Sequence, residues 1–235
     1  MLILVIMTMT IKKSHDRIQK SLDKGFMYHH LALARSEKFL RKHDSERLPM
    51  FVLYVDLVSS TKMSSELDPE IFNTLIRIFS QEMSYVIEQH SGYVLKFVGD
   101  AVLAYFLPSG KMPDKIITCA KTMRKIIEYA INPILEKKSY PKLEIKISVD
   151  FGNCSVVRYG SDKLKSHIDL IGLTLNLAAK MQQITKPGHI TIGGYVYEKL
   201  NSRNKVFFDK VKSYPKFWKY HGLDPNPYSV YTSNC

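Results

Sequence analysis

Two carboxylates and one lysine interrupt apolar stretches of the sequence where buried strands are expected. Asp56 lies within FVLYVDLV (51–58), and LKFVGDAVLAYF (95–106) carries Lys96 and Asp100 four positions apart. A bare charge in a core strand is costly unless it is compensated, and two neighbouring carboxylates can share a cation. Oxygen ligands without His or Cys nearby suit Mg²⁺ or Mn²⁺. The structural alternative is that Asp56 caps a polar loop, Asp100 is a turn residue and Lys96 is solvated.

The bulk composition limits the classes of partner. The chain has 235 residues, 45% of them apolar and 24% charged, which predicts one main soluble domain with a terminal extension. The net charge of +12 favours a polyanion such as nucleic acid, a membrane surface or nucleotide phosphates. The excess is spread along the chain without a block of like charges, which is more typical of a solvated surface.

The cysteines and the first residues of the chain indicate the cellular compartment in which the protein is expected. Cys119, Cys154 and Cys235 are far apart and lack CxxC spacing, which argues against a disulfide framework or a zinc site. This favours a reducing compartment, and we expect a cytoplasmic protein. The apolar segment 1–11 is shorter than the roughly 20 residues of a membrane span and is a poor signal peptide. We expect it to pack on a helix or a partner; weak membrane contact and an upstream start before Met7 or Met9 remain open.

The first half of the chain predicts a helical extension, a strand, a helix and a hairpin. Residues 12–43 are permissive for helix, and 51–58 is typical of a central strand. Asp68-Pro69-Glu70 predicts a helix start that runs to about Ser91-Gly92. The segment 93–106 predicts a hairpin with Gly99-Asp100 as its turn.

The second half predicts helix, strands and accessory elements. A helix is expected over about 113–137, with Pro133 disturbing its end, followed by the alternating strand LEIKISVDF (143–151). Gly152-Asn153 predicts a turn into CSVVRYG, and a helix follows over 173–185. HITIG, YVYEKL and aromatic-rich strands ending at YSVY complete the chain.

This order predicts an α+β, ferredoxin-like (split βαβ) fold: a mostly antiparallel sheet with helices on one face, plus C-terminal accessory strands. We expect residues 1–47 to form an apolar and helical extension and residues 48–235 to form the main domain.

Three segments together resemble the class III adenylyl and guanylyl cyclases over roughly residues 48–232. FVLYVDLVSST is similar to the family's first strand and phosphate-binding turn, and LKFVGDAVLAYF to its K-x-x-G-D hairpin. IDLIGLTLNLAAKMQQITKPGHITI is similar to its segment with the pattern D, G, N-x-x-x-R and P-G-x-I. Three such motifs in the right order make a strong signal.

The resemblance implies roles for the matching residues. Asp56 and Asp100 match the metal-binding aspartates, which would hold two Mg²⁺ or Mn²⁺ per active site. Lys96 and Asp169 match the pair that reads the base, and Asn176 matches the residue that orients the ribose. The backbone N–H groups of the turn Leu57, Val58, Ser59, Ser60 and Thr61 would bind phosphates.

Lys180 stands where the family usually has an arginine, and it would stabilise charge on the transferring phosphoryl group. Asn176 and Lys180 lie four residues apart, flanking an expected core stripe of Leu173, Leu177, Met181 and Ile184. Lys216 or Lys219 would assist the leaving pyrophosphate.

The resemblance implies an adenylate cyclase in intracellular signal transduction. Lys96 can donate to adenine N1 and Asp169 can accept from the exocyclic amine, whereas guanine reverses this pattern. ATP would become 3′,5′-cyclic AMP and pyrophosphate in a head-to-tail homodimer with two composite sites. One chain would supply Asp56 and Asp100, and its twin would supply Lys96, Asp169, Asn176 and Lys180.

Other functions stay open at this point. Lys180 in place of arginine favours a weak or silent nucleotide-binding regulatory domain, and a guanylate cyclase is a further alternative. A nucleic-acid-binding protein would need exposed aromatic residues in an RNP-like pattern, and Asp100 lies where phosphates would pass, so we expect no nucleic acid partner. A diguanylate cyclase is disfavoured because VGDAV lacks the G-G-[DE]-E-F turn.

Overall fold

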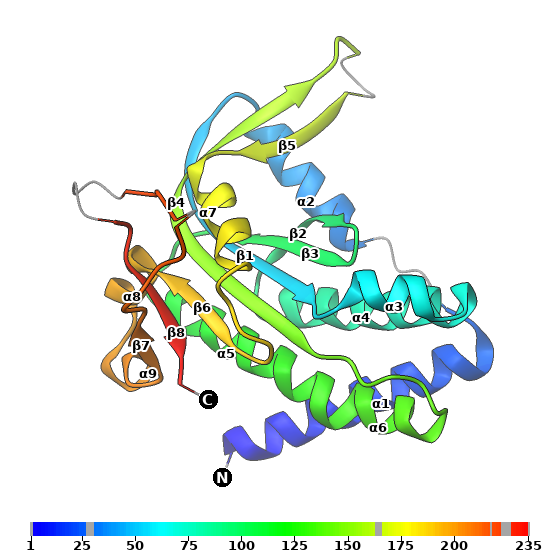
Figure 1. Ribbon diagram of the computed structural model, residues 1–235. Helices are drawn as coiled ribbons and strands as arrows, with labels where there is room; N and C mark the ends of the chain where they lie inside the picture. Colours follow the sequence, from blue (N-terminus) through cyan, green and yellow to red (C-terminus); the bar gives the residue numbers. More distant parts are fainter. Residues whose placement is uncertain (1, 27–30, 163–165, 217, 222–226, 235) are drawn as a thin grey trace.

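The computed structural model describes residues 2–26, 31–162, 166–216, 218–221 and 227–234 (Figure 1). Its helices are α1 (Leu2–Lys24), α2 (Leu31–Lys42), α3 (Ser60–Glu66), α4 (Pro69–Gln89), α5 (Met112–Ile126), the π-helix η1 (Ile127–Ile131), α6 (Asn132–Lys137), α7 (Leu173–Met181), α8 (Gly194–Lys199) and α9 (Ser202–Lys205). Its strands are β1 (Arg47–Leu57), β2 (Tyr93–Val98), β3 (Ala101–Phe106), β4 (Ile145–Tyr159), β5 (His167–Ile171), β6 (Ile190–Gly193), β7 (Phe208–Lys210) and β8 (Val230–Ser233).

The strands form one mixed, mostly antiparallel sheet in the order β2-β3-β1-β4-β6-β8-β7, and β5 pairs with the outer part of β4. Each described pair of neighbouring strands is antiparallel except β4 and β6, which are parallel. β7 and β8 extend the sheet at its C-terminal edge. The α+β fold, its mostly antiparallel sheet and its accessory strands are therefore confirmed.

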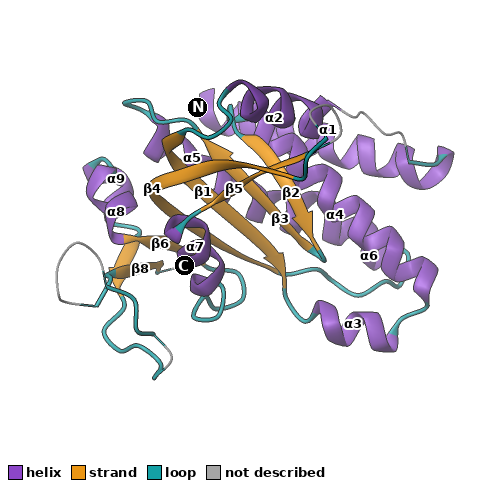
Figure 2. Cartoon of the chain, turned by 90° about the horizontal axis from the view of Figure 1, so that it is seen from above, coloured by secondary structure: helices purple, strands orange, loops and turns teal. Residues whose placement is uncertain are grey.

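Helices cover the two faces of this sheet unequally (Figure 2). Alternate residues of β1 such as Phe51 and Val55 are buried in one core with α1, α4, α5, η1 and α6. The residues between them, including Val52, are buried in a second core to which α2 and α7 contribute Leu40 and Ala178. The main helical layer lies on one face as expected. The near-continuous apolar run of β1 also requires cover on the other face, which α2 and α7 provide in part.

Two sequence signals locate the helix boundaries. Asp68 accepts a hydrogen bond from the Glu70 N–H at 2.8 Å, and Pro69 opens α4, as predicted. The expected helix over 113–137 exists as α5, η1 and α6 in direct succession. Pro133 has no N–H to donate to the preceding turn, and the adjacent Asn132 N–H donates to the Ile127 carbonyl in the wider π pattern.

The turn predicted at Gly152-Asn153 is wrong. β4 continues through both residues, with Gly152 opposite Met50 of β1, and the hairpin forms instead between β4 and β5. Gly152 does not have a positive φ, so no turn conformation requires a glycine there. The glycine instead leaves space for a neighbouring side chain. A Cβ built on it would lie 2.4 Å from Thr174 Oγ1, so glycine lets α7 approach the sheet.

The N-terminal helix α1 is fixed to the main helical layer. Its buried Ser14 donates to the carboxylate of Glu82 on α4, and Arg17 binds the same carboxylate with a 2.5 Å contact. Ile11 packs against the main core, whereas the side chains of residues 1–8 lie outside the described set. Among the described residues, no helix combines the length and hydrophobicity that crossing a bilayer requires.

Candidate active site

Asp56 and Asp100 lie next to each other at one end of the central strands. The ladder between β1 and β3 reaches Val55 and Val102, so Asp56 emerges beside the β2–β3 turn that carries Asp100. Gly99 has a φ of +61° and forms that turn as predicted. Burial, and after it the facing charge of Asp100, together raise the pKa of Asp56 to about 6.

These two carboxylates fit a divalent cation. One oxygen of Asp100, Oδ2, is fully buried and has no hydrogen-bond partner among the described residues. A bound cation would satisfy this oxygen and remove the repulsion that raises the pKa of Asp56. No group of three or more His, Cys, Asp or Glu side chains gathers elsewhere in the described residues to hold a metal. Further ligands at this site would come from oxygens of water, of substrate or of the backbone.

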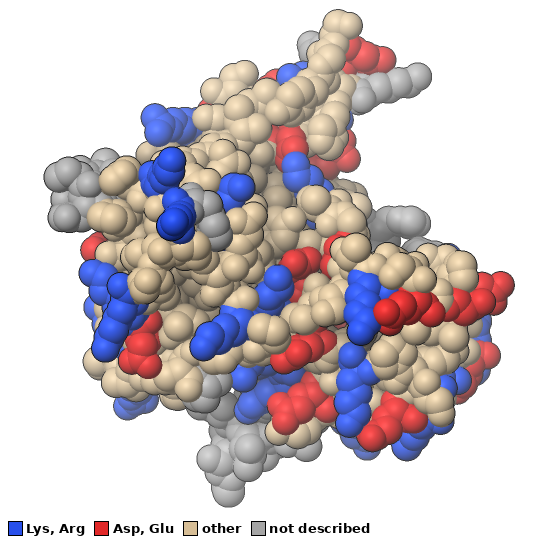
Figure 3. Space-filling view, viewed as in Figure 1, with Lys and Arg blue, Asp and Glu red and all other residues tan. Residues whose placement is uncertain are grey.

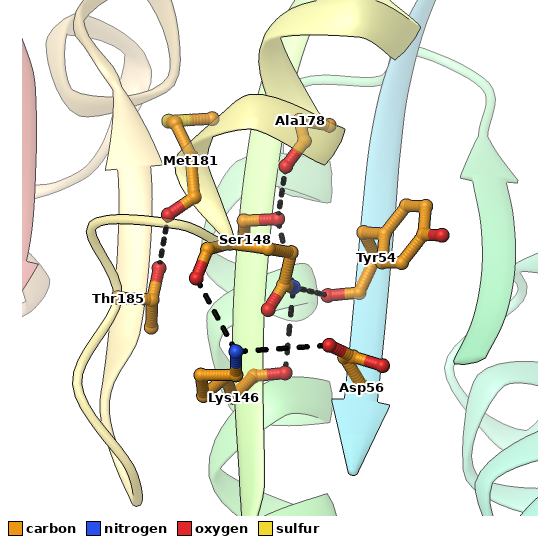
Figure 4. A network of polar contacts seen from close by, with 8 residues as sticks. Tyr54, Asp56, Lys146, Ser148, Ala178, Met181 and Thr185 are labelled. Carbon is orange, nitrogen blue, oxygen red and sulfur yellow. Dashed lines mark hydrogen bonds and ion pairs between the residues drawn. The ribbon is translucent and has the colours of Figure 1, made fainter. Parts of the chain in front are cut away.

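Lys146 also belongs to this end of the sheet (Figure 4), and the sequence analysis missed it. It lies opposite Asp56 in the ladder between β1 and β4, with Nζ 3.7 Å from Asp56 Oδ2. Its Nζ also donates to the Gln182 carbonyl at 3.5 Å. In sequence, a lysine at a polar position of an alternating strand indicates only solvent exposure. The informative signal was its register opposite Asp56, which depends on the tertiary pairing.

Gln182, which directly follows α7, ties that helix to the strands beside Asp56. Its side-chain amide donates to the Tyr54 carbonyl at 2.8 Å and to Ser148 Oγ at 3.0 Å. Ser148 in turn donates to the Ala178 carbonyl at 2.6 Å. The C-terminal end of α7 is therefore held within two residues of Asp56 along β1.

The predicted base-reading residues also meet. Lys96 on β2 forms an ion pair with Asp169 on β5, although 73 positions separate them in sequence. Asp169 is 8% exposed, and its Oδ1 accepts the Leu170 N–H at 2.9 Å. His167, which was not predicted, places Nε2 3.9 Å from Asp169 Oδ2. Within the described residues, no hydrogen bond or ion pair joins Lys96 or Asp169 to Asp56 or Asp100.

Asn176 and Lys180 lie on the exposed side of α7. Leu177 and Met181 are buried beneath them, as the expected stripe requires, and Ile184 packs partly against the same cluster. Leu173 is a correction: it is 55% exposed because it opens the helix outside the core. Thr174, Leu175 and Ala178 are buried in its place.

The predicted phosphate-binding turn is intact only in part. The Val58 N–H donates to the Glu144 carbonyl at 2.9 Å, so the prediction that this amide binds phosphate is wrong. Leu57 is buried at the end of β1, Ser59 has a φ of +59°, and α3 starts at Ser60 and continues through Thr61. For these four residues the role stays a prediction.

Lys219 is exposed in the short segment 218–221. The neighbouring Trp218 is buried in the cluster that contains Leu177 and Met181 of α7. This segment therefore packs beside the helix that carries Asn176 and Lys180, and Lys216 is exposed just before it.

Exposed apolar side chains accompany the candidate site residues. Phe97 and Val98 follow Lys96, Ile171 follows Asp169, and Leu173 opens α7; each is 43–55% exposed. On the face shown in Figure 3, acidic and basic side chains are interspersed, and no continuous basic stripe crosses it. This pattern matches the spread of charge along the sequence.

Several proteins with similar sequence or structure are named as nucleotide cyclases. The chain is 29% identical over 167 residues to a uridylate cyclase of Rhodovulum sp. (strain MB263), covering 67% of this chain and 68% of that protein. It is 24% identical to a cytidylate cyclase of Staphylococcus aureus, covering 77% of this chain but only 43% of the relative. The solved structure of the guanylyl cyclase Cya2 superposes with a TM-score of 0.69 at 22% identity, covering 81% of this chain and 93% of the other.

These names differ in the base that they specify, and adenylate cyclases also occur among the similar proteins. The family model described as "Adenylate and Guanylate cyclase catalytic domain" matches residues 45–216, which include Asp56, Asp100, Lys96, Asp169 and Asn176. The chain belongs to the adenylate and guanylate cyclase catalytic domain family, the class III nucleotide cyclases.

Proposed function

We propose that the chain is an adenylate cyclase that converts ATP into 3′,5′-cyclic AMP and pyrophosphate. The observation that carries the choice of ATP is the ion pair between Lys96 and Asp169. An ammonium can donate to N1 of adenine, and a carboxylate can accept from its 6-amino group. Guanine presents an N–H and a carbonyl at these positions, so GTP would leave both protein groups mismatched.

In the proposed reaction, the ribose 3′-oxygen forms a bond to the α-phosphorus and releases its proton, while the bond to pyrophosphate breaks. Divalent cations bound by Asp56 and Asp100 would lower the pKa of the hydroxyl and neutralise the triphosphate. Lys146 adds positive charge beside Asp56. Asn176 orients the ribose, and Lys180 stabilises the charge on the transferring phosphoryl group.

We place this reaction in a head-to-tail homodimer with two composite sites. Asp56 and Asp100 of one protomer would face the base-reading pair and α7 of its partner. The exposure of Asn176 and Lys180 supports this arrangement, since both would otherwise project into solvent. The exposed apolar side chains beside them are of the kind that a partner surface covers.

The test is direct product detection. The purified chain is incubated with ATP and Mg²⁺ or Mn²⁺, and cyclic AMP and pyrophosphate are measured. Asp56→Asn and Asn176→Ala should each abolish product, and Asp209→Asn, at an exposed position of β7, is the matched control. ATP binding without any cyclic product would instead support the silent nucleotide-binding alternative that Lys180 suggests.

The dimer has its own test. An equal mixture of Asp56→Asn and Asn176→Ala chains should recover about a quarter of the wild-type activity. Half of the dimers are then mixed, and each mixed dimer has one intact site of two. No recovery after subunit exchange has been verified would contradict the composite site.

A further inference from the structure

The Lys96–Asp169 pair presents its hydrogen-bonding groups in a fixed order. Lys96 can only donate, and an ionised Asp169 can only accept. The carboxylate is oriented from its own backbone, because Oδ1 accepts the Leu170 N–H while Oδ2 binds Lys96. With 8% exposure, Asp169 has little freedom to present another face. A base that meets this pair encounters one donor beside one acceptor.

The strand that carries Asp169 is itself held in place. β5 pairs with β4 from Tyr159 opposite His167 to Ser155 opposite Ile171. Arg41 of α2 donates to the Ser166 carbonyl at 2.8 Å, just before β5. Arg158, opposite Ile168 in the ladder, binds Asp44 at 2.7 Å. The order of donor and acceptor is therefore built into the fold, which a pair on a free loop would not achieve.

This order of donor and acceptor distinguishes bases by the hydrogen-bonding groups on their edge. It does not distinguish purines from pyrimidines. Adenine offers the N1 acceptor beside a 6-amino donor, and cytosine offers the N3 acceptor beside a 4-amino donor. Guanine and uracil both offer a ring N–H beside a carbonyl oxygen. With either of these keto bases, a donor would face the Lys96 ammonium and a carbonyl oxygen would face the Asp169 carboxylate.

We infer that this site selects amino bases as a class, so that CTP is a substrate alongside ATP while UTP and GTP are rejected. The inference rests on the proposed cyclase function and extends it to a pyrimidine. The reaction balances in the same way: the 3′-oxygen bonds to the α-phosphorus, the bond to pyrophosphate breaks, and the hydroxyl proton passes to solvent. The relatives named as cytidylate cyclases specify an amino base, whereas the relative named as a uridylate cyclase specifies a keto base, so the choice for this chain rests on its own pair.

The experiment compares two pairs of nucleotides. Within each pair, the hydrogen-bonding edge of the base changes and its ring system stays the same. ATP is compared with inosine triphosphate, and CTP with UTP. We expect kcat/KM to favour the amino member at least tenfold in both pairs. In Asp169→Asn both ratios should fall together by about tenfold, because the amide can donate to a keto oxygen. Asp209→Asn, an exposed carboxylate on β7 away from this pair, should leave both ratios unchanged.

Binding of 3′-deoxynucleoside triphosphates separates this inference from the cyclase proposal, because these compounds lack the attacking hydroxyl. Tighter binding of 3′-deoxy-CTP than of 3′-deoxy-UTP supports the inference even if the chain forms no cyclic product. Cyclisation of ATP and GTP ahead of both pyrimidines would overturn the inference and leave the cyclase function standing. Equal binding of the amino and keto members, or a preference unaffected by Asp169→Asn, would overturn it as well.

Discussion

Replacing Asp56 by asparagine should stabilise the metal-free protein while it abolishes cyclase activity. Burial and the facing Asp100 raise the pKa of Asp56 from 3.8 to about 6, so its ionised form is less favourable in the folded state than in the unfolded chain. Two pK units correspond to about 3 kcal/mol, which we reduce to about 1–2 kcal/mol because the side chain remains partly open to water. Asparagine removes this cost at neutral pH.

The sign of the pH dependence follows from the raised pKa. The folded state takes up a proton between about pH 4 and 6, so the cost of ionised Asp56 is complete above pH 6 and vanishes below 3.8. The advantage of Asp56→Asn should therefore be largest at pH 7.5 and fall to about a third of that value at pH 4.5. Saturating Mn²⁺ should make the wild type the more stable of the two, because the cation binds the Asp56 carboxylate that the variant lacks.

Urea unfolding in EDTA and in Mn²⁺ at both pH values measures these differences. Asp209→Asn, an exposed carboxylate on β7, is the control and should change stability little at either pH. Asp100→Asn should also stabilise the metal-free protein, since it removes the charge that faces Asp56. A metal-free Asp56→Asn variant that is less stable than the wild type at pH 7.5, or an effect that does not depend on pH, would refute the reasoning.

Substitutions at Lys180, Gly152 and Arg17 test other parts of the structure. Lys180→Ala should lower kcat about tenfold or more with nucleotide binding largely kept, and Lys180→Arg should match or exceed the native rate; unchanged turnover in the alanine variant would remove its assigned role. Gly152→Ala should cost about 1–3 kcal/mol in urea unfolding because its Cβ would meet Thr174 Oγ1, and adding Thr174→Ala should recover most of the loss. Arg17→Met should cost about 1–3 kcal/mol by leaving the buried carboxylate of Glu82 without its ion pair, whereas Arg17→Met with Glu82→Gln should be close to the wild type.

Local sequence patterns predicted most of the helices, strands and turns. They failed where contacts between distant segments determine the structure. Asp68-Pro69 located the start of α4, and Gly99-Asp100 located the β2–β3 turn, because the signal for each lies within a few residues. Gly152-Asn153 carries an equally good turn signal and lies inside β4. The glycine there serves the approach of Thr174 on α7, a contact that local patterns do not encode.

The same division applies to the candidate site. The motifs identified Asp56, Asp100 and Asp169 by type and order along the chain. They could not identify Lys146, whose position opposite Asp56 exists only once β1 and β4 pair in register. They also could not show that the Val58 amide is already bonded to the Glu144 carbonyl. Strand register therefore decides which polar groups are available for chemistry.

The β2–β3 hairpin supports the proposal that each active site needs two copies of the chain. Lys96 on one arm is bound to Asp169 of β5, whereas Asp100 at the turn lies beside Asp56 of β1. Within the described residues, each group of the hairpin is engaged with a different strand, and no hydrogen bond or ion pair links the two sets. In the proposed homodimer, a nucleotide would contact the two carboxylates of one protomer and the base-reading pair of the other. Under that proposal, the residues on this one hairpin would contribute to two different active sites.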